Sequence, residues 1–304
     1  MATLREIRGR IGGVKSTEKR TKAMKMVAAA KLRRAQGALL SARPYSRKLD
    51  DLMNHLVGGM DIDGNPLLVE RPVKAVAIIV VSADRGFCGA FNSNIIKAAV
   101  QHIRKNYSDL DALGQVSLFT VGKKSNDYFA KRNYNIAANY SGVFHDLQFS
   151  TARTLAAEVV NGYLIGKFDR VDVIYNEFKT VIQQRLVVDR FLPIRKDSLR
   201  TEKPEQKKGK YIRHDEIQYI YEPDKTSIIE ALIPKHLEFH LWRILLESNA
   251  AGEGARMAAM DNASENASEL ISALSLQYNK ARQAAITKEL LEVVSGAEAL
   301  NSIS

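Results

Sequence analysis

The chain has 304 residues, 45% hydrophobic and 26% charged, which is the composition of a folded soluble protein and excludes fibrous or disordered classes. Its formal net charge is +11, and the first 50 residues hold fourteen Lys and Arg against three acids, so they carry all of it. An acidic partner is therefore expected along the N-terminal segment. The single cysteine, Cys88, excludes an intramolecular disulfide and a cysteine-based metal site.

A long helix is predicted from about residue 3 to residue 56, with a possible kink at Pro44. Positions spaced alternately by four and three residues along it are mostly apolar: Ile7, Ile11, Val14, Glu18, Thr21, Lys25, Ala28, Leu32, Ala35 and Leu39. At 1.5 Å per residue, such a helix is a rod of roughly 80 Å. A rod of that length cannot bury its apolar face inside one compact domain, so it must pack on another long helix or enter another protein.

The middle of the chain alternates predicted strands with predicted helices. The strands are 73–83, 115–122 and 170–178, and the helices are 92–107, 123–132 and 150–167. This alternation, with nearly continuous apolar strands, predicts an α/β fold with a small, doubly wound parallel sheet of Rossmann-like type. More strand-like sequence follows at 183–194 and 213–223, and the charged segment between them, 197–211, predicts an exposed loop.

A short helix is predicted at 225–233, followed by a second long helix that begins at Pro234 in its first turn and runs to about residue 302. Its own four-three series is Met260, Ser264, Ala267, Ile271, Leu274, Tyr278, Ala281 and Ala285. This is the period of a left-handed coiled coil, so the two terminal helices are predicted to pair antiparallel. Gly252 and Gly254 are expected to weaken the second helix by ~1 kcal/mol each. The predicted domains are 1–58, 70–223 and 225–304.

Three segments could carry other chemistry. The turn at 82–94 has two glycines between a strand and a helix and could present backbone amides to a phosphorylated ligand, although its spacing fits no nucleotide motif. His236 and His240 lie one helical turn apart, but without a third ligand they predict no metal site. The basic run 19–34 suits nucleic acid, an acidic protein surface or a solvated helix face, and it lacks aromatic residues for base stacking.

The sequence predicts neither a secretory signal nor a membrane-spanning segment, and it has an apolar C-terminal end. The first residues are basic and lack the apolar core of a secretory signal, and the longest apolar run, 75–81, is too short to span a bilayer, so membrane contact is expected only through partners. The apolar segment 290–303 is unusual for a terminus and predicts a helix tip that another protein sheathes.

Four segments together resemble a known family. STEKRTKAMKMVAAAKLRRAQ (16–36) resembles the N-terminal helix of the gamma subunit of F-type ATP synthases, and SADRGFCGAFNSN (82–94) resembles its central loop. RMAAMDNASENASELI (256–271) and ITKELLEVVSGAEAL (286–300) resemble its C-terminal helix. The matches follow the family's order over nearly the whole chain.

The resemblance implies a central rotor shaft. The terminal helices would form an antiparallel coiled coil inside a head of alpha and beta subunits, and the α/β domain would contact epsilon and the membrane c-ring. Rotation driven by proton or sodium flow would then change the conformation of the catalytic beta subunits. The resemblance further implies a peripheral subunit with no catalysis of its own, no cofactor, no metal and no nucleic acid. The absence of a clear transit peptide favours the cytoplasmic face of a bacterial plasma (inner) membrane, and a processed organellar chain is the alternative. A basic coiled-coil protein that binds nucleic acid is the alternative.

The resemblance also assigns residues to partners. Beta-subunit contacts are implied at Met24, Arg282, Gln283 and Thr287. Foot contacts with the c-ring or epsilon are implied at Asp84, Arg85, Gly86, Phe87, Cys88 and Gly89. An apolar bearing is implied at Leu290, Leu291, Val293, Val294 and Leu300.

Overall fold

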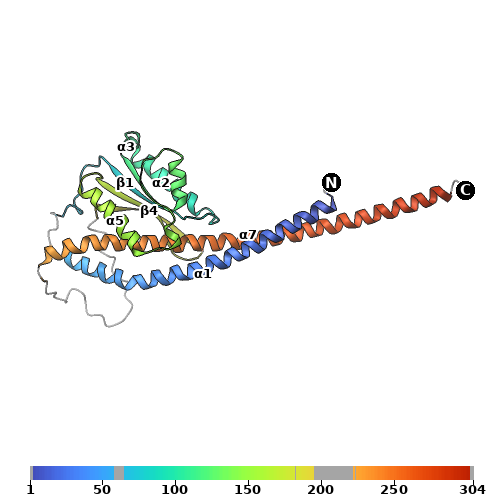
Figure 1. Cartoon of the computed structure of the whole chain (residues 1–304), viewed down its shortest axis with the longest axis horizontal. Coiled ribbons are helices and arrows are strands. Elements are labelled where there is room, and N and C mark those ends of the chain that lie inside the picture. The colour runs from blue at the N-terminus through green and yellow to red at the C-terminus, as the bar shows by residue number, and fades with distance from the viewer. Residues whose placement is uncertain (1–2, 58–64, 182, 195–221, 223, 302–304) are drawn as a thin grey trace. The chain divides into compact units, whose positions relative to one another are not determined.

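The structure is a computed structural model that describes residues 3–57, 65–181, 183–194, 222 and 224–301 (Figure 1). It divides into two compact units. Residues Met1–Ala29 and Met257–Ser304 form the coiled-coil unit, and residues Ala30–Arg256 form the sheet unit. Two long helices, α1 (Leu4–Val57) and α7 (Lys225–Asn301), contribute to both units. The predicted loop 197–211 and all but residue 222 of the predicted strand 213–223 lie outside the described residues.

Helix α7 is continuous, so the predicted break between a short helix and a second helix at Pro234 is wrong. Proline removes one helical hydrogen bond, but the apolar residues on both sides of it share one core. Ile229, Ile233 and Leu237 are all buried in the cluster that packs beneath the sheet. Burial of this face holds the helix together across the missing hydrogen bond. Pro44 likewise lies inside α1.

The sheet has five strands in the order β3-β2-β1-β4-β5. They are β1 (Val76–Val81), β2 (Val116–Val121), β3 (Ile136–Tyr140), β4 (Arg170–Phe178) and β5 (Gln184–Leu192). The first four strands are parallel, as predicted, whereas β5 runs antiparallel to β4. The short connection between β4 and β5 explains that direction, because a parallel pair needs a long crossover.

Helices cover both faces of the sheet. They are α2 (Phe91–Asn106), α3 (Ser108–Ala112), α4 (Lys123–Ala130), the short 3-10 helix η1 (Val143–His145) and α5 (Phe149–Leu164). In Figure 1, α2 and α3 lie on one side of the sheet and α5 on the other. Alternate residues of β1 follow this division, since Ile78 packs in the core beneath α2 and Ile79 in the core shared by α5 and α7. The predicted doubly wound architecture is confirmed.

Helix α7 passes the carboxyl ends of β1 and β4, where the order of the strands reverses. A Cβ added to Gly252 would lie 3.4 Å from the Phe91 ring and 3.9 Å from Ala83, just after β1. A Cβ added to Gly254 would lie 3.5 Å from the ring of Phe178, the last residue of β4. The two glycines therefore let the helix approach this edge closely. In doubly wound proteins ligands commonly bind in this crevice, and here the chain's own helix lies against it.

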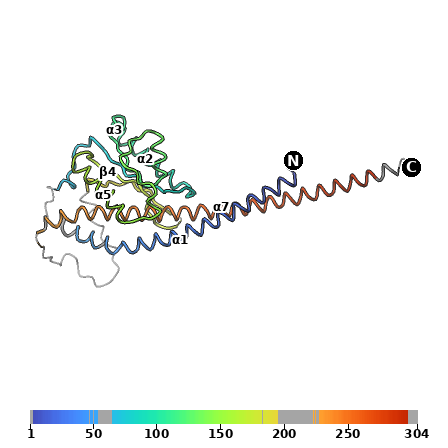
Figure 2. Tube along the Cα trace, viewed as in Figure 1, coloured from blue at the N-terminus to red at the C-terminus, as the bar shows by residue number. Residues whose placement is uncertain are grey.

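In the coiled-coil unit, three polar pairs join the two helices. They are Arg8–Tyr278 (2.5 Å), Thr21–Ser264 (2.7 Å between hydroxyl oxygens) and Lys25–Asp261 (2.6 Å). The two residue numbers of each pair add up to 285 or 286, which is the signature of an antiparallel register (Figure 2). Every position of both predicted four-three series is buried or half-buried. The predicted antiparallel coiled coil is thus confirmed.

Candidate partner-binding surfaces

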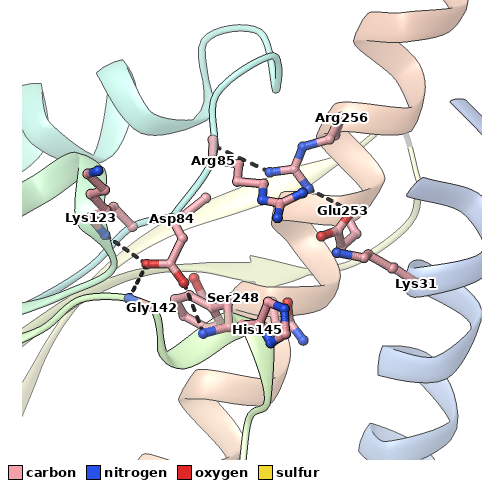
Figure 3. A pocket seen from close by; sticks show the side chains of 14 residues that line it. Lys31, Asp84, Arg85, Lys123, Gly142, His145, Ser248, Glu253 and Arg256 are labelled. Carbon is pink, nitrogen blue, oxygen red and sulfur yellow. Dashed lines mark hydrogen bonds and ion pairs between the residues drawn. The ribbon is translucent and has the colours of Figure 1, made fainter. Parts of the chain in front are cut away.

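The β1–α2 loop (residues 82–90) is tied to the neighbouring loops by one carboxylate. Asp84 accepts hydrogen bonds from the backbone amides of Lys123 (2.9 Å), Gly142 (2.7 Å) and Phe144 (3.0 Å) (Figure 3). The loops after β1, β2 and β3 are therefore held together at the carboxyl edge of the sheet. Backbone amides at this edge are the usual anion-binding groups of such folds, and these three are already used by the protein's own aspartate.

Helix α7 holds the same loop from the opposite side through Arg256. The guanidinium donates to the carbonyl oxygens of Gly86 (3.2 Å) and Arg85 (3.3 Å) and pairs with Glu253 at 2.6 Å. The side chains of Arg256 and Glu253 are only 11% and 12% exposed. The sequence analysis does not predict this clamp. The one local signal for it is the pair of opposite charges, Glu253 and Arg256, three residues apart on a predicted helix.

The tip of the loop presents an aromatic ring to solvent. Phe87 is 71% exposed and has a φ of 60°, which a non-glycine residue rarely adopts. Behind it, Cys88 is buried and accepts a hydrogen bond from Asn92 (3.1 Å). Burial raises the pKa of the Cys88 thiol, so the side chain is an uncharged thiol rather than a nucleophile. A pinned, strained loop with an exposed aromatic tip is typical of a contact surface.

The structure places the predicted beta-subunit contacts at two levels of the coiled coil. Arg282, Gln283 and Thr287 lie together on exposed turns of α7, where the Thr287 hydroxyl donates to the Gln283 carbonyl oxygen at 3.0 Å. Met24 is half-buried on α1, and the antiparallel register places it opposite a residue about 20 positions before Arg282. At 1.5 Å per residue the two sites are roughly 30 Å apart, too far for one short loop to contact both.

The last turns of α7 extend beyond the register of the coiled coil. Helix α1 begins at Leu4, which the register places opposite residue 281 or 282, so α7 has no described partner helix after about residue 282. The apolar side chains in this stretch are exposed, namely Ile286, Leu290, Leu291, Val293 and Val294. Leu300 belongs to the helix, but its side chain lies outside the described residues. A group of exposed apolar side chains of this kind is typical of a contact surface.

A buried polar cluster lies around Asp172, near the amino end of β4 and therefore at the opposite end of the parallel strands from the β1–α2 loop. The carboxylate, 1% exposed, contacts His102 (2.7 Å), the Tyr107 hydroxyl (2.5 Å) and Arg170 (3.0 Å). Burial by itself would raise the pKa of Asp172, but the two hydrogen bonds and the arginine charge outweigh it, so the pKa lies below its usual range. Its partners come from α2, from the residue between α2 and α3 and from β4 itself, and its chemistry is that of a structural ion network.

The histidine pair on α7 is the remaining candidate for a metal site. His236 and His240 lie on one face of α7 with ring centroids 6.1 Å apart, and burial lowers the pKa of His240 to about 3. Within the described residues, no three His, Cys, Asp or Glu side chains are grouped as a metal site would require. Among the same residues, no helix has the length and apolar character needed to cross a membrane.

Comparison with known proteins decides the family. A family model described as ATP synthase matches residues 3–300. The ATP synthase gamma chain of Chloroherpeton thalassium is 52% identical over 304 residues, which cover 99% of each chain. This chain belongs to the ATP synthase gamma chain family. Another gamma chain, from Chlorobaculum tepidum, is 50% identical over 301 residues and again covers 99% of both chains.

Solved structures share the fold of this gamma chain. A chain of the Euglena gracilis mitochondrial ATP synthase (OSCP/F1/c-ring) matches with a TM-score of 0.65 at 18% identity, over 98% of this chain and 95% of that one. A chain of the central stalk/c-ring structure from Tetrahymena thermophila mitochondrial ATP synthase matches with a TM-score of 0.58 at 22% identity, over 80% and 99%. None of these comparisons supports the nucleic-acid alternative.

Proposed function

We propose that this gamma chain is the central-stalk rotor subunit of an ion-driven ATP synthase, which transmits rotation of the c-ring to the catalytic beta subunits. The observation that carries the proposal is the whole-chain family match, together with an antiparallel coiled coil whose register is fixed by polar pairs. The driving ion is a proton or sodium. A shaft must transmit torque without its helices sliding, and the Thr21–Ser264 and Lys25–Asp261 contacts oppose sliding.

We further propose that the chain is not catalytic by itself. The crevice where a doubly wound sheet would bind a substrate is approached by α7 at Gly252 and Gly254, and the amides beside it are occupied by Asp84. These two features favour a mechanical role for the α/β unit over nucleotide chemistry. The catalytic groups then belong to the beta subunits.

We assign different parts of the chain to different partner subunits. Residues 1–58 and 225–304 form the shaft inside the alpha and beta subunits, and 70–223 form the foot, whose β1–α2 loop contacts epsilon or the c-ring. The related structures are of F1/c-ring and central stalk/c-ring assemblies. The similar gamma chains come from bacteria such as Chloroherpeton thalassium, which supports a peripheral place at the cytoplasmic face of the plasma membrane.

Reconstitution tests the proposal directly. Co-expression with alpha and beta subunits should give a stable complex whose steady ATP hydrolysis depends on this chain. Assembly of alpha and beta without retention of the chain, or equal turnover in its absence, would contradict the rotor function. The ATPase assay of the purified complex is the measurement.

Replacing Arg282 and Gln283 with alanine should lower ATP hydrolysis by the reconstituted complex about tenfold. A hydrogen bond from a charged group to a carboxylate contributes about 1.5–3 kcal/mol, and both side chains are free to donate from an exposed surface. The matched control is Lys280→Ala, which removes one exposed cation two residues away on the same helix. An equal loss in the control would show that general charge, rather than this site, matters.

Deleting residues 290–304 should reduce torque and hydrolysis several-fold while leaving the foot functional. The deletion removes the exposed apolar stripe, and each apolar side chain sheathed by a partner contributes about 1.5–3 kcal/mol. Co-purification of epsilon and the c-ring with the truncated chain should be unchanged. Loss of that co-purification would show that the two ends of the rotor do not act separately.

A further inference from the structure

Four aromatic side chains from three helices form a continuous patch in the sheet unit. Tyr45 of α1 lies beside Phe239 of α7, with ring centroids 4.6 Å apart. Phe149, the first residue of α5, lies 6.3 Å from Phe239 and 5.9 Å from Trp242, and the second of these contacts is edge to face. These four residues are called the aromatic patch below.

The aromatic patch reaches the surface of the unit. Trp242 packs against the core shared by α5 and α7, and Phe239 is half-buried. Tyr45 is 54% exposed and Phe149 is 39% exposed. An aromatic ring stabilises a fold chiefly by leaving water, and these two rings have left it only in part. Exposed aromatic rings that are grouped in this way are typical of protein–protein contact surfaces.

A cavity of about 190 Å³ borders the aromatic patch between α1 and α7. Phe239 forms part of its wall, together with the apolar side chains of Leu39 and Ala42. Two charged groups in the wall compensate each other, since Arg243 lies 4.0 Å from Glu247. A hollow beside exposed rings is the arrangement in which an apolar anchor side chain of a partner is commonly seated.

Three cations surround the patch. Arg43 lines the same cavity, and Lys48 and Arg153 follow the α1 ring and the α5 ring by one helical turn, so they share the helix faces of those rings. All three side chains are exposed. Glu238, one turn before Trp242, brings one negative charge and is half-buried. The balance is positive, so the complementary partner carries acidic side chains around its apolar anchor.

The patch lies halfway along the part of α7 that belongs to the sheet unit. This part runs from Lys225 to Arg256, and Phe239 and Trp242 are each 14 residues, roughly 21 Å, from the nearer end. In the proposed rotor, the end at Arg256 continues into the coiled coil and the head, and the end at Lys225 is turned toward the c-ring. A surface on the side of the unit, between these ends, suits the remaining partner, epsilon.

We propose that the aromatic patch is a docking surface for an acidic, amphipathic segment of the epsilon subunit. An apolar side chain of that segment would enter the cavity beside Phe239, and its carboxylates would face Arg43, Lys48 and Arg153. The proposal rests on the proposed rotor function, and it adds a second contact to the one proposed for the β1–α2 loop.

Calorimetric titration of the reconstituted complex of alpha, beta and this chain with purified epsilon, at about 150 mM salt, tests the proposal. Tyr45→Ala and Phe149→Ala should each weaken epsilon binding about tenfold, because each removes an exposed ring that binding would bury. Tyr45→Phe keeps the ring and should bind epsilon like the natural chain. Arg153→Gln should slow the association and make its rate less dependent on salt.

The control variant is Leu113→Ala, whose side chain is 72% exposed on the turn before β2, a turn that carries no residue of the patch. It should leave epsilon binding unchanged, and an equal loss there would overturn the proposal. Natural epsilon affinity in Tyr45→Ala and Phe149→Ala, with only the stability to urea lowered, would also overturn it, because the rings would then serve packing alone. Both outcomes leave the rotor function standing, whereas failure of the natural complex to bind epsilon would contradict the proposed partner itself.

Discussion

Replacing Asp172 with alanine is expected to lower the free energy of unfolding by about 3 kcal/mol or more. Removing one member of a buried ion network leaves the other charge without compensation, which costs about 3–5 kcal/mol. Here Arg170 would lose its carboxylate, and the Tyr107 hydroxyl, whose pKa is raised by burial and by its bond to Asp172, would lose its acceptor. Urea denaturation, followed by the fluorescence of the single tryptophan, Trp242, measures the change in the sheet unit.

The pH dependence of this loss has a definite sign. The pKa of Asp172 is lower in the folded protein than its ordinary value of 3.8. A carboxyl with a depressed folded pKa contributes stability above its unfolded pKa and loses that contribution as the pH falls through the folded pKa. The difference between the natural chain and Asp172→Ala should therefore be constant near neutral pH and shrink below about pH 4.

Asp109→Ala is the matched control for this substitution. Asp109 is exposed on the short helix α3, so its removal should change stability by no more than about 0.5 kcal/mol. If both variants lose the same stability, or if the loss at Asp172 persists unchanged at pH 3, the buried network does not stabilise the fold as described.

The coiled coil and the sheet could be predicted from sequence because their signals are local. The four-three spacing of positions such as Ile7 and Leu274 encodes a helix seam wherever the partner helix lies. The apolar run 75–81 likewise encodes a buried strand before any neighbour is known. Strand β3, by contrast, has the sequence IAANY, and alanine and asparagine have low strand propensity. Residues 136–140 form a strand because their backbone can pair with β2, and such pairing with a distant segment leaves no pattern in the local sequence.

The Arg256 clamp and the Asp172 cluster could not be predicted because each joins residues distant in sequence. Tyr107 and Asp172 are 65 positions apart, and Arg256 and Gly86 are 170 apart. Only the packed sheet brings them together. Pro234 failed as a helix boundary for a similar reason, since the buried face of α7 outweighs its local preference. From the sequence, Gly252 and Gly254 predict only a local weakening of the helix, whereas their packing role depends on Phe91 and Phe178, which the fold brings against them.

Gly122→Ala should be the most damaging single-methyl addition in the sheet unit, with an expected loss of about 4 kcal/mol. Gly122 has a φ of 92° and a ψ of 141°, a conformation that is essentially restricted to glycine. An added Cβ would also lie 2.2 Å from the backbone oxygen of Ser82, far inside contact distance. The strain contributes about 1–3 kcal/mol and the clash a similar amount.

The damage should reach the candidate site. Gly122 joins the ends of three strands, because its amide donates to the Tyr140 carbonyl oxygen at 3.1 Å while Ser82 donates to Val121 at 2.8 Å. The clash would push the loops after β1 and β2 apart. It would thereby break the hydrogen bond that the Lys123 backbone amide donates to the Asp84 carboxylate. The variant should therefore lose the ordered β1–α2 loop before the coiled coil, and co-purification with epsilon should fall more than co-purification with alpha and beta.

Gly142→Ala separates the clash from the backbone strain. Gly142 also has a positive φ, 86°, but nothing lies within 4 Å of the position of its added Cβ. Strain alone should lower the free energy of unfolding by about 1 kcal/mol. Urea denaturation of both variants, again followed by Trp242, gives the comparison. A loss at Gly122 several times that at Gly142 is the expected result, because only the first substitution forces the Ser82 backbone to move. Equal losses would mean that the carboxyl edge of the sheet yields freely, and a foot that yields there could not hold its partner-binding loop rigid under torque.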